Sequence, residues 1–203
     1  MSKKPIIVFE GIESSGKSHH INKVANYLKK RKIKFIKIRE PGGSKNSEKI
    51  RDLILDNKST FNKHTDLLLY LSARSENIDL IKNNMGKKII LIDRFVDSTI
   101  AYQHYGMSID IKLIKLINNF LLKDIKVTFT FLNIVNHKNM KHRLAKRNKL
   151  NRYDKFKSIF YKKVQEGFLK LLKHNPKKYM KINSNLDINI NEKIILSKIN
   201  KLI

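Results

Sequence analysis

The chain has 203 residues, with 44 Lys and Arg against 17 Asp and Glu, which gives a formal net charge of +27. It contains no cysteine, so disulfides and thiolate metal sites are excluded and a reducing compartment is suitable. The first apolar run is short and is soon interrupted by Glu10, which argues against a signal peptide or a membrane span, so we expect a cytoplasmic protein.

The high positive charge has two interpretations. One is attraction to polyanions such as nucleic acid. The other is compositional bias, because the lysines are spread along the whole chain and the sequence is rich in Asn and Ile, which have A- and T-rich codons. We favour the second and expect no specific nucleic-acid partner, although a positive field still attracts a phosphorylated substrate.

The run from Gly11 to Ser18 lies between an expected strand at about 5–10 and an expected helix at about 17–32. Strand, glycine-rich turn and helix are the context in which G-x-x-x-x-G-K-[ST] forms a P-loop. Lys17 can then reach the β- and γ-phosphates of a nucleotide, and Ser18 can offer its hydroxyl to Mg²⁺. The alternative is a glycine turn that enters a helix, with Lys17 merely solvated. The expected ATP-binding residues of this turn are Gly11, Ser14, Ser15, Gly16, Lys17 and Ser18.

A second strand is expected at 34–38, and the loop Arg39-Glu-Pro-Gly-Gly43 follows it. Arg39 therefore lies at the carboxyl end of a strand, where open α/β sheets bind ligands. Helical patterns follow at about 46–55 and 63–84, and Tyr70 and Arg74 share one face of the second. Ordinary packing is the alternative explanation for that pair.

A third strand, at 88–93, is apolar enough to be buried on both faces. Asp93 ends this strand, where a carboxylate can meet the P-loop Mg²⁺ directly or through water. Arg94 follows at once, and these two residues could simply pair with each other. The polar run at 97–103 resembles a ligand-binding wall more than a core helix.

The rest of the chain continues the alternation, with helices expected at 111–122, 154–172 and 191–202 and strands at 127–132 and 178–182. This order predicts an α/β fold with three layers, α/β/α, and a central five-stranded parallel sheet in a single domain of residues 1–203.

A strongly basic segment spans 141–152. It could be a nucleic-acid arm, a solvated helix end, or a short lid at about 143–154 that closes cations over phosphates. Arg143 and Arg147 share a helical face, which costs stability unless an anion lies between them. His19, His20 and His64 show no metal-binding spacing, so surface or core roles are expected for them.

Taken together, four sequence blocks resemble the thymidylate kinase family of P-loop nucleoside-monophosphate kinases. The P-loop alone is shared with many unrelated NTPases, whereas the other three blocks are more specific. These blocks are the P-loop, Arg39-Glu-Pro-Gly-Gly43, Leu69-Tyr-Leu-Ser-Ala-Arg74, and Asp93-Arg94 with the run from Ser98 to Gln103.

The resemblance implies the reaction ATP + dTMP → ADP + dTDP with Mg²⁺, in dTTP synthesis, by a homodimer. It places the metal at Ser18 and Asp93 and the 3′-hydroxyl of dTMP at Glu13. The catalytic residues that it implies are Lys17, Arg39, Arg94 and Arg147.

For the nucleotide base and sugar, the resemblance implies that Tyr70 stacks on thymine, where the family usually has Phe, and that Arg74 hydrogen-bonds the base. Ser98 and Gln103 match polar contacts to the base, and Tyr102 matches the ring that favours deoxyribose. The complete set of substrate-binding residues is Glu13, Arg39, Tyr70, Arg74, Arg94, Ser98, Tyr102 and Gln103.

The lid also carries a family feature. Ser14 occupies a P-loop position where some members have arginine, so the chain resembles the members that supply this cation from the lid. The resemblance assigns Arg143 to ATP, but it leaves open which lid arginine contacts the transferred phosphate. The usual Asp-Arg-x-Glu at the end of the lid reads Asn151-Arg-Tyr-Asp154 here.

Two rival functions stay open at this stage. A deoxynucleoside kinase would need a carboxylate base, for which Glu40 is a candidate, but Arg39 and Arg94 would then have no phosphate to hold. A P-loop nucleic-acid-binding ATPase would explain the charge, but the chain has no segment left for a nucleic-acid domain.

Overall fold

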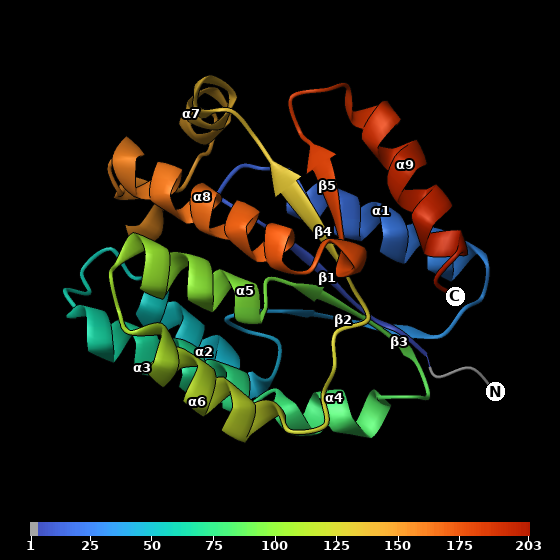
Figure 1. Ribbon diagram of the computed structural model, residues 1–203, viewed down its shortest axis with the longest axis horizontal. Coiled ribbons are helices and arrows are strands. Elements are labelled where there is room, and N and C mark those ends of the chain that lie inside the picture. Colours follow the sequence, from blue (N-terminus) through green and yellow to red (C-terminus); the bar gives the residue numbers. More distant parts are fainter. Residues whose placement is uncertain (1–3) are drawn as a thin grey trace.

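A computed structural model describes residues 4–203, and its centre is a parallel sheet (Figure 1). The five strands in this part of the chain are β1 (Ile6–Gly11), β2 (Phe35–Arg39), β3 (Ile89–Asp93), β4 (Phe129–Ile134) and β5 (Tyr179–Asn183). Their spatial order is β2-β3-β1-β4-β5, and every neighbouring pair is parallel. The predicted parallel sheet of five strands is confirmed.

The central strands are formed by the most apolar runs of the chain. All residues of β1 are buried, as are the first four of β3. Unbroken runs of β-branched and aromatic residues suit strands that are covered on both faces. Successive β1 residues point to opposite faces, so Ile7 and Phe9 belong to one core cluster and Ile6 and Val8 to another.

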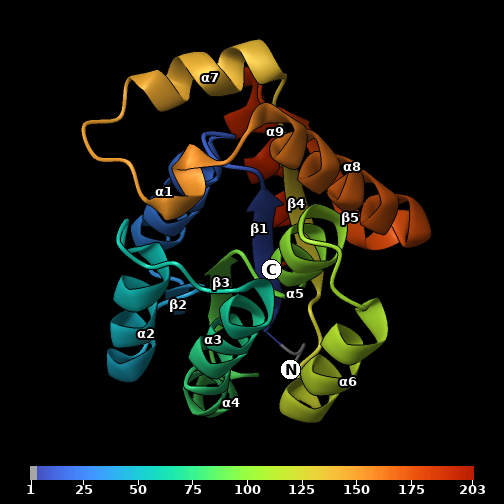
Figure 2. The same ribbon diagram turned by 90° about the vertical axis from the view of Figure 1, so that its left-hand side faces the viewer.

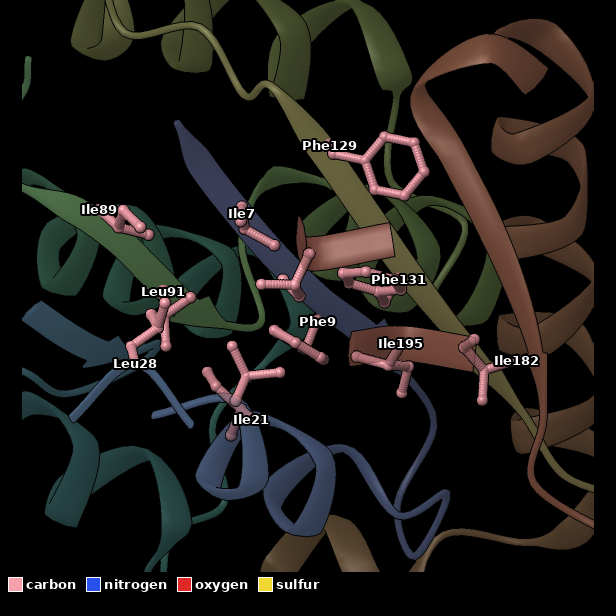
Figure 3. Packing of buried hydrophobic residues seen from close by; sticks show 12 residues of the cluster. Ile7, Phe9, Ile21, Leu28, Ile89, Leu91, Phe129, Phe131, Ile182 and Ile195 are labelled. Carbon is pink, nitrogen blue, oxygen red and sulfur yellow. The ribbon is translucent and has the colours of Figure 1, made fainter. Parts of the chain in front are cut away.

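Helices cover both faces of the sheet, which gives the predicted three layers. On one face, Ile21 of α1 (Lys17–Lys30) and Ile195 of α9 (Ile188–Asn200) pack against Phe9 and Phe131 (Figure 3). The other face is covered by helices that include α4, α5 and α8. The bounds of the remaining helices are α2 (Lys45–Leu55), α3 (Lys63–Ser75), α4 (Ile78–Asn84), α5 (Val96–Thr99), η1 (Ile100–Gly106), α6 (Ile111–Leu122), α7 (His137–Ala145), η2 (Arg152–Lys155), α8 (Ser158–His174) and η3 (Pro176–Lys178).

The single helix expected at 63–84 is wrong, because α3 ends at Ser75 and α4 begins at Ile78. Asn77 lies at the break and is fully buried. Its side chain donates to the carbonyl of Gly42 at 2.7 Å and accepts from the backbone N–H of Ser44 at 3.0 Å. The break therefore ties the helix pair to the Pro-Gly-Gly loop.

The polar run at 97–103 is helical, so the expectation that it is not a core helix is wrong, but Ser98, Thr99, Tyr102 and Gln103 do form part of a cavity wall, as predicted. The helix α5 continues into the wide π-turns of η1, where Tyr102 and Gln103 are buried. Likewise, the helix expected from 154 begins only at Ser158. Asn151 and Asp154 cap the short helix η2 in front of it.

Figure 2 shows α7 and the segment that follows it lying over the carboxyl end of β1. None of the helices within residues 4–203 is long and apolar enough to cross a membrane.

Candidate active site

A cavity of about 580 Å³ lies at the carboxyl end of the sheet. It is lined by the P-loop from Glu13 onward, the ends of β2 and β3, α3, α5, η1, the lid, and the segment between β5 and α9. All predicted site residues line it except Gly11. The structure thus brings together residues from most of the chain.

The P-loop backbone requires both of its glycines. Gly11 has φ +139°, and a Cβ there would lie 2.3 Å from the carbonyl oxygen of Asn133. Gly16 has φ +88° and caps α1. The Lys17 ammonium curls back over the loop and donates to the carbonyl of Ile12 at 2.8 Å.

Lys17 is only 6% exposed, so the alternative of a solvated lysine is wrong. Burial, aided by nearby Arg94, lowers the pKa of Lys17 to about 7. A bound phosphate would reverse this shift, because an adjacent anion favours the charged ammonium.

The hydroxyl of Ser18 donates to Oδ2 of Asp93 at 3.1 Å. One hydroxyl and one carboxylate suit Mg²⁺, which protein kinases and ATPases hold with few protein ligands, substrate phosphates and water. The described residues contain no cluster of three His, Asp or Glu side chains that could form an all-protein metal cage. The donor set therefore fits Mg²⁺ delivered with a nucleotide.

Arg94 does not pair with Asp93, its neighbour in the sequence. Its Nη2 lies 2.8 Å from Oε1 of Glu13, and its Nη1 donates to the carbonyl of Gly11 at 2.9 Å. Its guanidinium also lies over the ring of Tyr102, 5.1 Å from the centroid. The hydroxyl of Tyr102 donates to the other carboxylate oxygen of Glu13. These contacts hold Arg94 on the wall of the cavity, directly beside the P-loop.

Arg39 lines the cavity, but Glu48 holds its guanidinium. The Nη2–Oε2 and Nε–Oε1 distances are 2.6 and 3.2 Å. Its side chain is 55% exposed, so this pair is a solvated one. A phosphate would have to share Arg39 with Glu48 or replace that carboxylate.

Arg74 and Glu40 form a buried ion pair in the lining of the cavity, with Nε 2.8 Å from Oε2. Nη1 of Arg74 also donates to Asn118 at 2.6 Å. Because Glu40 is committed to Arg74 and its side chain is 4% exposed, it is not a free general base. This removes the candidate base of the deoxynucleoside kinase alternative. Tyr70 lies on the same face of α3, and its ring lies edge-on to that of Tyr153, with the centroids 5.8 Å apart.

Comparison with known proteins agrees with this geometry. The family model described as thymidylate kinase matches residues 9–195. A thymidylate kinase of Staphylococcus epidermidis is 37% identical over 182 residues, covering 88% of this chain and 89% of that protein. One of Thermosipho africanus is 39% identical, covering 82% and 84%. The crystal structure of thymidylate kinase from Ehrlichia chaffeensis superposes with a TM-score of 0.79 at 29% identity, covering 98% and 99% of the two chains.

The chain belongs to the thymidylate kinase family. It is therefore an enzyme of the nucleoside-monophosphate kinase group, a transferase with an ATP-binding P-loop. Its fold is that of the family, as the resemblance predicted.

Within this family framework, the lid arginines of the chain have different environments. Arg143 donates to the carbonyls of Ser184 and Ser14, at 2.6 and 3.3 Å. Arg147 pairs with Asp154 at 2.7 Å. Both line the cavity, whereas Arg152 does not.

Arg152 contacts α2 and α3 instead. It pairs with Asp66 of α3 and donates from Nε to the carbonyl of Ile54 at 3.0 Å. It therefore ties the end of the lid to α2 and α3 and leaves the cavity to the other two lid arginines.

The sequence interpretation missed two residues, Arg51 and Glu10, that contact other parts of the site of this thymidylate kinase family member. Arg51 lines the cavity and donates to the carbonyl of Pro41 at 2.6 Å. Glu10 is buried and accepts from the backbone N–H of Phe95 at 2.8 Å and the hydroxyl of Ser98 at 2.5 Å. The signal for Glu10 was available, because a carboxylate that ends a buried strand needs a partner.

The contacts of Glu10 bear on Ser98, which was predicted to contact the base. The Ser98 hydroxyl donates to Glu10, which does not line the cavity, and it accepts from Nη1 of Arg94 at 3.3 Å. Burial raises the pKa of Glu10 to about 7, and nearby Asp97 adds to this effect.

The three histidines do not form a metal site. His19 lies 2.7 Å from Glu192, and His64 is exposed near the start of α3. His20 is buried and lines the cavity, and burial lowers its pKa to about 4, so it is neutral.

Proposed function

We propose that this chain transfers the γ-phosphoryl group of ATP to dTMP, giving ADP and dTDP, in dTTP synthesis. One observation carries the assignment of substrates to sites. A single cavity is lined by the P-loop, by Tyr70 and Arg74 of α3, and by Arg94. Arg94 contacts Gly11 and Glu13 of the P-loop on one side and the ring of Tyr102 on the other. Donor and acceptor phosphates would therefore meet beside Arg94.

The acceptor needs no general base. The second pKa of a phosphate monoester is about 6, so the attacking oxygen is largely ionised at neutral pH. The remaining barrier is electrostatic, because two anions must approach in line. Arg94 and Arg39 would hold the acceptor phosphate, and the approach of this phosphate would release Glu13 to accept from the 3′-hydroxyl of the sugar.

The donor end supplies the remaining positive charge. Lys17 and the backbone N–H groups of Ser14 to Ser18 would hold the β- and γ-phosphates, with Arg143 beside the nucleotide. Ser18 and Asp93 would hold Mg²⁺ directly or through water, and this ion would screen the charge on the phosphate oxygens. Arg147 would turn from Asp154 to the transferred group as the lid at 143–154 closes and excludes water.

Base recognition would rest on Tyr70, Arg74 and Gln103, with Tyr102 against the sugar. The contacts of Ser98 support a different role from the predicted contact with the base. Its hydroxyl is hydrogen-bonded to Glu10 and to Arg94, so Ser98 would position Arg94 and would not contact the base itself.

We further propose a single domain, a cytoplasmic location and a homodimer built on α3 and α6. These helices pack together through Leu67, Leu71 and Ile114. Their outer faces expose Leu68 (55%), Leu116 (67%) and Phe120 (69%). Apolar side chains this exposed on adjacent helices support a second copy as the partner that covers them.

The reaction is tested by incubating the chain with Mg²⁺ and ATP labelled in the γ-phosphate, with or without dTMP. We expect the label in dTDP only when dTMP is present, and loss of transfer when the metal is chelated. Release of labelled inorganic phosphate at the same rate with and without dTMP would contradict the proposal.

A further inference from the structure

Gln103 is a fully buried side chain on η1 that lines the cavity. Its amide nitrogen Nε2 donates to the hydroxyl oxygen of Tyr153 at 3.4 Å. Its amide oxygen Oε1 is buried and has no hydrogen-bond partner among the described residues. A buried acceptor without a partner is costly, so this oxygen is suited to a donor on a ligand in the cavity.

The Tyr153 hydroxyl determines which end of the Gln103 amide it contacts and therefore which end is left without a partner. Tyr153 lies in η2, at the end of the lid, and is 2% exposed. Its hydroxyl donates to Oδ2 of Asp66, and the other oxygen of Asp66 pairs with Arg152. A carboxylate held by an arginine accepts hydrogen bonds only, and a tyrosine has one hydroxyl proton. That proton is therefore committed to Asp66, and Tyr153 can only accept from Gln103.

Packing holds this tyrosine in place. The Tyr153 ring lies edge-on to Tyr70 and Tyr102, with centroid distances of 5.8 and 5.9 Å. Asp66 is 1% exposed, so water does not compete freely for its carboxylate. The fold therefore fixes the direction of donation in these hydrogen bonds, from Gln103 to Tyr153 and from Tyr153 to Asp66.

We propose that Asp66 and Tyr153 are positioning residues that orient the Gln103 carbonyl into the acceptor-base pocket and so select pyrimidines with an N3–H donor. This inference rests on the proposed function. Thymine and uracil carry a proton on N3, which can donate to Oε1 of Gln103. Cytosine has a lone pair on N3, so two acceptors would face each other in a buried site. Sites built for one hydrogen-bond pattern reject ligands that leave their polar groups unpaired.

Arg74 also favours a base with a carbonyl at position 4, because a guanidinium only donates. Variants of Asp66 or Tyr153 would leave this contribution of Arg74 in place. They would remove only the selectivity that depends on Asp66 and Tyr153. Uracil differs from thymine only at the 5-methyl group, so discrimination between dTMP and dUMP would not depend on this chain of hydrogen bonds.

The test compares kcat/KM for dTMP, dUMP and dCMP in the unmodified chain, Tyr153→Phe, Asp66→Asn and the control Tyr105→Phe. Tyr105 lies two residues from Gln103 on η1, and its ring packs on His104 and Gly167. In Tyr153→Phe the dTMP:dCMP ratio should fall about tenfold or more, since the Gln103 amide can then turn. The dTMP:dUMP ratio should stay constant, and the control should change neither ratio.

The variant Asp66→Asn should change the selectivity more than Tyr153→Phe does, because the amide of the new asparagine can donate to the Tyr153 hydroxyl. The hydroxyl proton of Tyr153 would then point to Gln103, and the Gln103 amide would turn so that its oxygen accepts this proton. The ratio of kcat/KM for dCMP to kcat/KM for dTMP should therefore rise more than it does in Tyr153→Phe. An equal loss of kcat/KM for all three acceptors in both variants would mean a merely structural role and would overturn the inference. If the unmodified chain used none of the three, the proposed function would fail together with it.

Discussion

Arg94 and Glu13 form an ion pair in the lining of the cavity, with Nη2 and Oε1 2.8 Å apart. Both side chains are largely buried, at 17% and 12% exposure. The pair keeps Arg94 oriented before a substrate enters, so little reorganisation is needed when a phosphate replaces the carboxylate.

Replacing Arg94 should therefore abolish most of the activity. We expect Arg94→Ala to lower kcat about 10³-fold, because the guanidinium stabilises charge on the reacting phosphates. Arg94→Lys should restore only a small part, since an ammonium lacks the planar fork. Steady-state kinetics check both variants, with thermal melting as a control for folding. Near-normal turnover in Arg94→Ala would remove this residue from the proposed site.

Lys17→Ala should also lower kcat severely, by about 10²-fold or more, because the P-loop loses the only side-chain cation that its motif supplies to the donor phosphates. Lys23→Ala is a matched control. It lies on the same helix, α1, but its ammonium pairs with Glu192, with the two groups 2.6 Å apart. The control should retain turnover. Equal kinetics in the two variants would contradict the role given to Lys17.

Glu10 should make stability depend on pH. Its pKa is raised from 4.5 to about 7 in the folded chain, so folding favours the protonated form. The resulting contribution is fully present below pH 4.5 and is lost as the pH rises through about 7. At about 1.4 kcal/mol for each unit of pKa, the free energy of unfolding should fall by about 3 kcal/mol relative to Glu10→Gln across that window.

Urea unfolding of both proteins between pH 4.5 and 8 measures this difference. Asp97, whose pKa burial also raises, is present in both chains. A gap between the two unfolding free energies that did not change with pH would show that Glu10 does not titrate in this range.

The apolar face of α3 and α6 should control the oligomeric state. Phe120 is 69% exposed, so Phe120→Glu should leave the monomer folded while placing charge in the proposed dimer interface. Sedimentation velocity should show a dimer for the unmodified chain and a monomer for the variant. Leu186→Glu, at an exposed site between β5 and α9, is the control and should stay dimeric. A monomeric unmodified chain at micromolar concentration would contradict the proposed interface.

The features that follow from local pattern were predictable from the sequence. The apolar runs of β1 and β3 mark buried strands, and the spacing from Gly11 to Ser18 marks the P-loop. The break at Asn77 was not predictable, because it depends on hydrogen bonds to a loop more than 30 residues earlier. Helical periodicity continues through this position in the sequence and carries no sign of it.

The same limit applies to side-chain partners within the site. Motifs indicate which residues gather, but they do not show which carboxylate each arginine meets. Arg152 has the same residue type as Arg143 and Arg147, yet it pairs with Asp66, which lies 86 residues away in the sequence. Such pairings follow from the three-dimensional arrangement of α2, α3 and the lid, which local patterns do not encode.

The most direct test is the rate of ADP formation from Mg·ATP with a panel of acceptors: dTMP, dUMP, dCMP, dGMP, AMP, thymidine and none. We expect strong preference for dTMP, with little ADP formed in the absence of an acceptor. Thymidine as the sole acceptor, or ATP hydrolysis that does not depend on an acceptor, would contradict the monophosphate site built around Arg94, Tyr70 and Arg74.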